Sequence, residues 1–208
     1  MFIEKLKETF GYNIPIFTNE ILDLFPEYTR AYIFRMMKKA ISDGSLVQVD
    51  KAVYYIPKST KLGLSTITAS DIIKKKYIEN NSSIYGIYGG LVLQNGFSLT
   101  TQIANIPEII TNKEATRSRK ITVNGRTFIL KKSRTQINSD NVHSYTILQL
   151  FTENNGIEIN DKAKKYIGEY IKENKIKKED LLNMSKSFPD KTLKKLMYSG
   201  VLNETLWR

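Results

Sequence analysis

EYTRAYIFRMMKKAISDGSLVQVDKAVYYI, residues 27–56, is the stretch that decides the fold expected for the N-terminal part of the chain. In its first half, apolar residues recur every three or four positions, as they do on the buried face of an amphipathic helix. These residues are Ile33, Met36, Met37, Ala40 and Ile41. We therefore expect a helix over Glu27–Ser42 that Asp43-Gly44 ends.

Two short runs rich in β-branched and aromatic residues follow this helix. Leu46–Val49 and Val53–Ile56 predict two strands joined at Asp50-Lys51, a β-ribbon over Leu46–Ile56 that Pro57 ends. Upstream, the apolar spacing predicts helices over residues 2–10 and 19–25. Three helices followed by a two-stranded ribbon is the element order of a winged helix-turn-helix, so we expect that fold over residues 1–60.

The remainder, residues 61–208, predicts a second, α+β domain, which makes the whole chain an α+β protein. Residues 58–70 are polar and rich in Gly, Ser and Thr, which is typical of an inter-domain linker. A hairpin is expected where Lys120–Val123 and Thr127–Lys131 flank Asn124-Gly125, the pair that a type I′ turn favours. From about residue 141 the pattern is helical, with helices expected over residues 142–151, 161–172, 178–184 and 189–199.

Residues 71–103 give three further predictions. Asp71–Glu79 is expected to be helical, and Ile84–Gly96 to be a buried helix closed by Asn95-Gly96. Gly86 and Gly90, four residues apart, would then face the same way and let another backbone approach. Phe97–Ile103 is expected to be a short strand.

The composition favours a polyanionic partner. The 208 residues include 32 Lys and Arg against 21 Asp and Glu, which gives a net charge of +11. Such a surplus attracts nucleic acid or an anionic membrane surface, although a Lys-rich genome that decorates every surface with Lys would produce the same count. No apolar run is long enough to span a bilayer, the first residues do not resemble a signal peptide, and cysteine is absent. We therefore expect a cytoplasmic protein without membrane attachment.

The outward face of the helix over Glu27–Ser42 carries the candidates for DNA contact. If Ile33, Met37 and Ile41 point inward, the opposite side and its flank hold cations and tyrosines and no acid between Tyr28 and Ser42. Arginine pairs with guanine edges in the major groove, whereas lysine chiefly contacts phosphates. The candidate DNA-binding residues are Thr29, Arg30, Tyr32, Arg35, Lys38 and Lys39, with Lys51 at the ribbon turn.

The alternative to DNA binding is that these residues are solvated helix residues in a domain that binds protein. Over residues 1–62 the charge is only +2, nine cations against seven acids, so this domain alone predicts modest affinity.

A denser basic run lies in the second domain. Between Asn112 and Arg134 there are eight cations and one acid, Glu114, on a loop and a hairpin. The candidates for polyanion binding there are Lys113, Arg117, Arg119, Lys120, Arg126, Lys131, Lys132 and Arg134. A basic hairpin that is merely solvated is the alternative. Whether its ligand is DNA, RNA or a protein stays open.

Signals of enzymatic chemistry are weak. The one histidine, His143, has no carboxylate at a suitable spacing, and a structural role is favoured. Without cysteine, and with five widely spread carboxylates in residues 63–140, no metal site is indicated. Gly86, Gly89 and Gly90 lack the Gly-Lys-Ser/Thr of a phosphate-binding loop. We expect no catalytic residue, metal or cofactor.

Two segments resemble a known family. The first segment is similar to the ribbon of AbiEi-type antitoxins, which belong to bacterial type IV toxin–antitoxin and abortive-infection systems; it reads Gly44-Ser-Leu-Val-Gln-Val-Asp-Lys-Ala-Val-Tyr-Tyr-Ile-Pro57. The second resembles the segment that opens the second domain of these proteins; it reads Tyr88-Gly-Gly-Leu-Val-Leu-Gln-Asn-Gly-Phe-Ser-Leu-Thr-Thr-Gln102. The resemblance covers roughly residues 1–135. Ala52 stands where the family usually has glycine, and the helical segment after residue 140 has no counterpart that we identify.

The resemblance implies a function. It implies a transcriptional autorepressor that binds inverted repeats in double-stranded DNA at its own promoter, as a possible homodimer. It also implies an antitoxin that counters a cognate nucleotidyltransferase toxin, in a class of system where no stable complex with the toxin is required. Two alternatives stay open: a nucleic-acid-processing phage-defence effector with a winged-helix targeting domain, and a winged-helix protein-interaction module.

Overall fold

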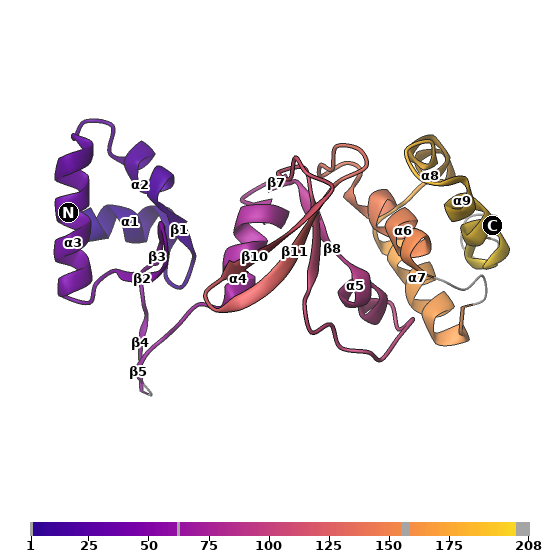
Figure 1. Cartoon of the computed structure of the whole chain (residues 1–208), viewed down its shortest axis with the longest axis horizontal. Helices are drawn as coiled ribbons and strands as arrows, with labels where there is room; N and C mark the ends of the chain where they lie inside the picture. The colour runs from indigo at the N-terminus through magenta and orange to yellow at the C-terminus, as the bar shows by residue number, and fades with distance from the viewer. Residues whose placement is uncertain (1, 62, 155–158, 203–208) are drawn as a thin grey trace. The chain divides into compact units, whose positions relative to one another are not determined.

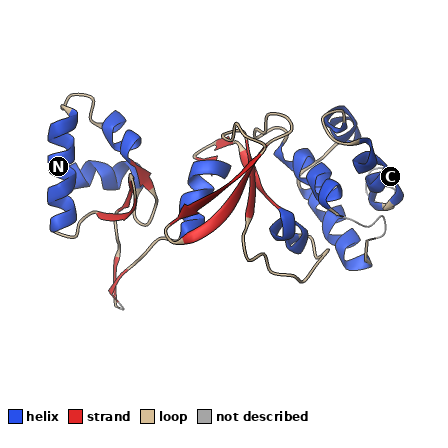
Figure 2. Cartoon of the chain, in the orientation of Figure 1, coloured by secondary structure: helices blue, strands red, loops and turns tan. Residues whose placement is uncertain are grey.

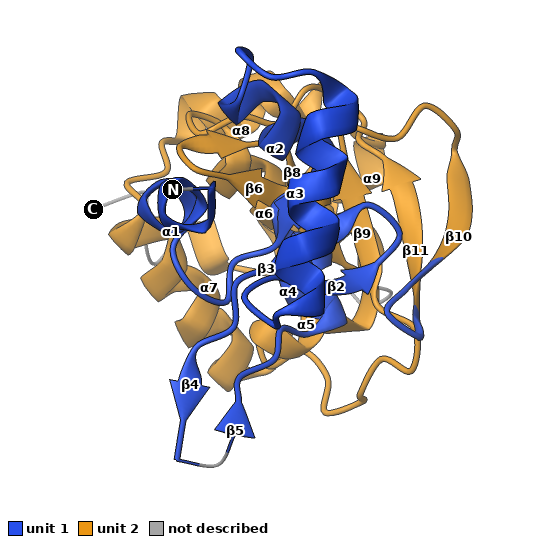
Figure 3. Ribbon diagram, turned by 90° about the vertical axis from the view of Figure 1, so that its left-hand side faces the viewer, with its two compact units in different colours: residues 1–75, 122–126 blue, residues 76–121, 127–208 orange. Residues whose placement is uncertain are grey.

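The protein is described here from a computed structural model, in which residues 2–61, 63–154 and 159–202 are described. Helices and strands are mixed along the chain, which confirms the predicted α+β class (Figure 2). The chain divides into two compact units (Figure 3). The first unit contains residues 1–75 and 122–126, and the second contains residues 76–121 and 127–208. The first unit thus extends past the predicted boundary at residue 60.

The first unit contains a small sheet and the helices that precede its last two strands (Figure 1). Its elements up to residue 55 are, in order, α1 (Phe2–Phe10), β1 (Ile16–Phe17), α2 (Thr18–Leu24), α3 (Arg30–Ser42), β2 (Val47–Asp50) and β3 (Val53–Tyr55). The sheet order is β1-β3-β2, and both pairings are antiparallel. Two predicted strands and three predicted helices therefore form in their expected places, and β1 is an addition.

Helix α3 begins later than predicted. Thr29 has extended backbone angles, and its hydroxyl accepts a hydrogen bond from the Tyr32 N–H at 3.3 Å, so the helix starts at Arg30 rather than Glu27. The helix buries Ile33, Met37 and Ala40, but Ile41 is exposed, so its predicted inward position is wrong.

The core of the first unit joins all three helices to the sheet. The buried side chains that form it include Leu6, Ile16, Ile21, Ile33, Met37, Leu46 and Ile56. A smaller cluster on the other side of β3 contains Val53, Tyr55, Ile67 and Ile72, with Val123 packed against it. Residues 122–126, the tip of the hairpin, thus share in the packing of the first unit.

Residues 58–70, the predicted inter-domain linker, are assigned to the first unit. They contain the short hairpin β4 (Ser59–Thr60) and β5 (Gly63–Leu64). The Lys58 N–H donates to the Ser65 hydroxyl at 2.8 Å, and the Tyr55 hydroxyl donates to the Ser65 carbonyl at 3.1 Å. The predicted helix over Asp71–Glu79 forms as α4 (Ala69–Ile73) and one π-helical turn, η1 (Lys74–Ile78).

The second unit is built on a mixed sheet. Its strands are β8 (Gly86–Gly89), β9 (Glu108–Thr111), β10 (Ser118–Val123) and β11 (Arg126–Lys132). The order is β10-β11-β9-β8, in which β11 and β9 are parallel and β8 and β9 are antiparallel. A two-stranded pair, β6 (Glu79–Asn80) with β7 (Ser83–Ile84), precedes β8. The predicted hairpin is confirmed, and Asn124 and Gly125 both have positive φ, as a type I′ turn requires.

The helix predicted over Ile84–Gly96 is wrong in its first half. Residues 86–89 form β8, and only Gly90–Gly96 is helical, as α5. A Cβ at Gly86 would lie 2.1 Å from the Tyr77 carbonyl oxygen and 2.8 Å from that of Ile110, so this glycine serves the close packing of a strand. Gly90 has a φ of +60° at the turn from β8 into α5, so the two glycines do not share a helix face.

Two further expectations differ from the structure. Phe97–Ile103 contains no strand, because Phe97 turns into the core while Ile103 is 89% exposed. Strand β9 was not predicted. The four expected C-terminal helices are confirmed as α6 (Val142–Glu153), α7 (Asp161–Glu173), α8 (Lys178–Ser185) and α9 (Asp190–Tyr198).

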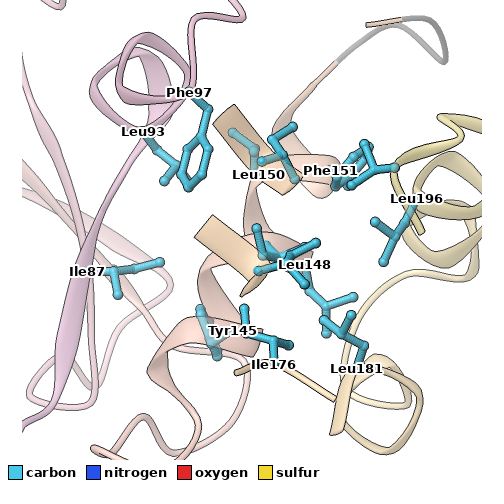
Figure 4. Packing of buried hydrophobic residues seen from close by; sticks show 14 of the residues in the cluster. Ile87, Leu93, Phe97, Tyr145, Leu148, Leu150, Phe151, Ile176, Leu181 and Leu196 are labelled. Atoms are coloured by element: carbon cyan, nitrogen blue, oxygen red, sulfur yellow. The ribbon is translucent and has the colours of Figure 1, made fainter. Parts of the chain in front are cut away.

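Helix α6 is the centre of the second unit. Nearly all of its residues are buried, including the polar Ser144, Thr146 and Gln149. It contacts β8 and α5 on one side and α8 and α9 on the other. Figure 4 shows Tyr145, Leu148 and Leu150 of α6 among apolar side chains from the surrounding elements. In the described part of the chain, no helix is both long and apolar enough to cross a membrane.

Candidate nucleic-acid interface

The outward face of α3 presents the predicted DNA-binding cations to solvent. Arg30, Arg35, Lys38 and Lys39 are all exposed, whereas Ile33, Met37 and Ala40 hold the opposite face in the core. This arrangement follows from helical geometry, since residues that fall between the buried positions must point away from the core. The helix therefore carries four cations on the side that the first unit does not use for its own packing.

The tyrosines at the start of α3 belong to an aromatic row. The rings of Tyr28 and Tyr32 lie 4.9 Å apart, and the Arg35 guanidinium lies 5.1 Å from the Tyr32 ring centre. The row continues through Phe25 to Phe2, whose rings are stacked at 4.9 Å. The Tyr32 ring restrains Arg35, because a guanidinium close to an aromatic face is attracted to it.

Thr29 has a structural task in addition to its predicted role. Its hydroxyl oxygen caps the first turn of α3 by accepting the Tyr32 N–H. The hydroxyl proton is still available to a phosphate oxygen, because capping uses only an oxygen lone pair.

Lys51 lies on the turn between β2 and β3, away from α3 in the chain. Its side chain is exposed, and the next residue, Ala52, has a φ of +61°. Asp50 organises the turn, since one carboxylate oxygen accepts the Lys51 N–H at 2.6 Å and the other accepts the Asn124 N–H at 2.8 Å. The turn that displays Lys51 is therefore held against residues 122–126 within the first unit.

A pocket of about 400 Å³ lies beside the aromatic row in the first unit. Its apolar walls are Phe2 from α1, Phe25 and Tyr28 from the connection between α2 and α3, and Tyr32, Ile33 and Met36 from α3. Its polar lining is Glu4, Lys5, Glu8 and Glu27. Tyr32 therefore borders a surface with three carboxylates, which would repel phosphates, and the exposed cations of α3 are better placed than Tyr32 for contact with a polyanion.

The basic run at residues 113–134 is divided between the units. Arg126 belongs to the first unit, and the other seven candidates belong to the second. Lys113, Arg117, Lys120, Lys132 and Arg134 are exposed. Arg117 and Lys132 are brought together, since the Lys132 N–H donates to the Arg117 carbonyl at 3.4 Å.

Two of these cations are held by carboxylates. Arg119 Nε lies 2.6 Å from an oxygen of Glu114, the side chain of which is only 3% exposed. Burial alone would raise the pKa of Glu114, but hydrogen bonds from the N–H and hydroxyl of Thr116 and from Arg119 outweigh it and hold that pKa below its ordinary value. Lys131 Nζ lies 2.5 Å from Glu108 Oε2. Arg119 and Lys131 therefore have structural partners.

Two others rest on aromatic rings. Lys113 Nζ lies 3.5 Å from the centre of the Tyr85 ring, and the Arg134 guanidinium lies 5.7 Å from that of Phe188. Both contacts still leave the side chains exposed, so both could contact a polyanion.

A pair of carboxylates in the second unit was not anticipated. Glu153, near the end of α6, accepts the Gly90 N–H and the Gln149 side-chain amide, each at 2.8 Å. Burial raises its pKa, and the negative charge of Glu108 adds to that effect, while the two hydrogen bonds and Lys131 oppose it. Each Glu153 oxygen is engaged, so this carboxylate fixes the turn between β8 and α5. Sequence spacing could not have paired Glu108 with Glu153, because they come together only through the fold.

His143 contacts the Tyr170 side chain. Its Nδ1 lies 2.8 Å from the Tyr170 hydroxyl on α7, and burial lowers its pKa. Among the described residues, no group of three or more His, Cys, Asp or Glu side chains is placed to hold a metal ion.

The first unit is thus a small α+β unit with a cation-bearing helix, and the second is a mixed sheet packed on helices. Comparison of the sequence with models of protein families gave no match. Comparison with curated proteins gave no match either.

Proposed function

We propose that the first unit is a winged helix-turn-helix that binds double-stranded DNA through α3, and that the protein is a transcriptional autorepressor and antitoxin of the AbiEi type. The observation that carries the DNA-binding part is the exposed face of α3 with Arg30, Arg35, Lys38 and Lys39. The antitoxin part depends on the resemblance of residues 44–57 and 88–102 to that family.

The topology supports the winged-helix assignment. In that fold a helix, a short strand, two helices and a two-stranded ribbon follow one another, and the ribbon and short strand form one sheet. The first unit has the order α1-β1-α2-α3-β2-β3 and a β1-β3-β2 sheet. In winged helices the third helix enters the major groove, and the turn of the ribbon touches an adjacent groove or phosphate. Lys51 would make the latter contact.

The distribution of charge along the chain supports the assignment of sequence recognition and of affinity for DNA to different parts of the protein. Residues 1–62 have a net charge of only +2, whereas the chain has +11. Because nonspecific affinity grows with the number of phosphates neutralised, α3 would supply recognition, and cations elsewhere in the chain would supply much of the affinity.

The test of DNA binding is a titration of the full chain against a labelled duplex that spans the promoter of its own gene. We expect binding at least about tenfold tighter than to a scrambled duplex of the same composition, with affinity that falls as salt rises. Equal affinity for both duplexes would remove the repressor proposal. Absence of salt-sensitive DNA binding would favour the protein-interaction alternative.

The antitoxin part has a separate test. We expect a nucleotidyltransferase gene beside this one, and we expect coexpression of this protein to restore the growth of cells that express that enzyme. Failure to restore growth while promoter binding persists would leave a repressor that is not an antitoxin.

A further inference from the structure

We propose that the pocket between α1 and the start of α3 binds a small organic cation, a protonated amine joined to an aromatic or apolar body. This site lies in the first unit and is distinct from the exposed cation face of α3. The proposal goes beyond DNA binding and does not depend on it. It rests on the pocket's size, its walls and its charge.

The size and walls fit a small molecule. A volume of about 400 Å³ lies in the range of known ligand pockets, which are mostly apolar with a few polar groups. Among the lining residues, Phe25 and Ile33 are buried, while Tyr28 is 41% exposed. The stacked rings of Phe2 and Phe25 and the tilted pair of Tyr28 and Tyr32 supply aromatic surface to an incoming group.

The charge selects a cation. Glu4, Glu8 and Glu27 line the pocket together with one lysine, Lys5. The N-terminal ammonium interacts with Glu4 and lowers its pKa, so the excess negative charge of the lining comes from Glu8 and Glu27, on a chain of net charge +11. Negative side chains next to aromatic faces are the combination that binds ammonium groups, because the ring face carries partial negative charge. An anionic or neutral ligand of the same shape would gain neither interaction.

The ammonium of Lys5 already makes, within the chain, the two kinds of contact that we propose for the ligand. Its ammonium lies 4.7 Å from the centre of the Phe25 ring and 3.7 Å from a carboxylate oxygen of Glu27. Lys5 and Glu27 remain 44% and 51% exposed in their side chains, so this pair is readily exchanged for a ligand ammonium beside Glu27.

The experiment uses three probes that differ chiefly in charge: phenethylammonium, 2-phenylethanol and phenylacetate. Binding to the ¹⁵N-labelled full chain is followed by NMR shift perturbation in the absence of DNA. We expect phenethylammonium to shift resonances of the residues that line the pocket and to bind about tenfold tighter than 2-phenylethanol, with phenylacetate weakest. Equal affinity of the three probes would overturn the proposal. The absence of shifts at these residues at about 20 mM phenethylammonium would also overturn the proposal. Even the weakest binding expected of a ligand of this size should give measurable occupancy of the pocket at that concentration.

Variants test whether binding depends on residues of the pocket or only on the overall charge of the surface. Glu27→Gln removes one charge while keeping the shape, and we expect about three- to fivefold weaker binding of phenethylammonium and a smaller dependence on salt. Tyr28→Ala removes an aromatic wall and should weaken both phenethylammonium and 2-phenylethanol. Asp23→Asn is the matched control, since Asp23 is an exposed acid of α2 outside the pocket lining. If Asp23→Asn weakens binding as much as Glu27→Gln, the effect is one of overall charge and the site assignment is wrong.

Discussion

The ammonium of Lys75 lies 2.9 Å from the carboxylate of Glu20 and 2.6 Å from the carbonyl oxygen of Pro15. Both side chains are largely withdrawn from solvent, at 10% and 19% exposure. The same ammonium lies near the rings of Phe10 and Phe17. Through these contacts Lys75, in η1, is tied to α1, β1 and α2, so residues beyond the expected boundary at 60 are part of the first unit.

Lys75→Met should therefore destabilise the first unit. Removal of one partner leaves the Glu20 carboxylate poorly solvated without its cation, which should lower the free energy of unfolding by about 3 kcal/mol. Urea denaturation followed by far-ultraviolet circular dichroism measures this change. Lys58→Met, at an exposed lysine of the same unit, is the control and should have little effect. Equal stability of Lys75→Met and the wild type would show that the ion pair contributes nothing.

Local rules predicted much of this fold. The helices of the first unit, the Asn124-Gly125 hairpin and the four C-terminal helices each depend on short-range periodicity, turn residues and caps. The prediction of a helix over Ile84–Gly96 was wrong because Gly86 lies in a strand, where the backbone carbonyls of Tyr77 and Ile110 leave no room for a Cβ. Only the folded chain brings these residues near Gly86. The candidate site shows the same division. The exposed face of α3 followed from helical spacing, whereas the pocket, the Glu114–Arg119 pair and the Glu153 contacts depend on tertiary structure.

Arg35→Ala should weaken binding to promoter DNA by about 1–3 kcal/mol and relax sequence preference, if Arg35 contacts a base. Stacking on Tyr32 restrains its guanidinium for such a contact. Lys38→Ala is the comparison within the same helix, and we expect it to weaken specific and scrambled duplexes alike. A gel-shift titration on both duplexes gives the two affinities. Unchanged promoter affinity of Arg35→Ala would make the recognition role of α3 untenable.

Arg119→Ala and Lys120→Ala should have different effects although the residues are neighbours. Arg119 compensates the buried Glu114, so its loss should lower stability by about 1–3 kcal/mol. Lys120 is exposed, so Lys120→Ala should leave stability unchanged and reduce the salt dependence of DNA binding if this strand contacts phosphates. Thermal unfolding and a salt series measure the two effects. Equal destabilisation by both variants would contradict the structural role of Arg119.

Ala52→Gly should stabilise the first unit. Ala52 has a φ of +61°, a conformation that costs a residue with a Cβ about 1 kcal/mol or more, while glycine adopts it freely. Since glycine also gains freedom in the unfolded state, we expect a net gain below about 1 kcal/mol. Ala31→Gly, at an exposed position inside α3, is the matched control and should destabilise by about 1 kcal/mol. Differential scanning calorimetry of the two variants would show shifts of opposite sign, and a lower Tm for Ala52→Gly would contradict the strain argument.

Glu153 should make the protein less stable as pH rises. Burial, together with the nearby charge of Glu108, raises the pKa of Glu153 above its ordinary value of 4.5 in the folded chain. The folded state therefore holds this proton more tightly than the unfolded state does. The resulting stabilisation is fully present below pH 4.5 and is lost as pH rises through the folded pKa.

Glu153→Gln does not titrate and keeps a carbonyl oxygen for the Gly90 N–H. We therefore expect the stability of the wild type to fall relative to this variant as the pH rises above 4.5, measured by urea denaturation at each pH. Glu169→Gln, at a half-exposed acid of α7, controls for the loss of one charge. If the wild type and Glu153→Gln keep a constant difference over that range, the Glu153 carboxyl does not titrate differently in the folded and unfolded states.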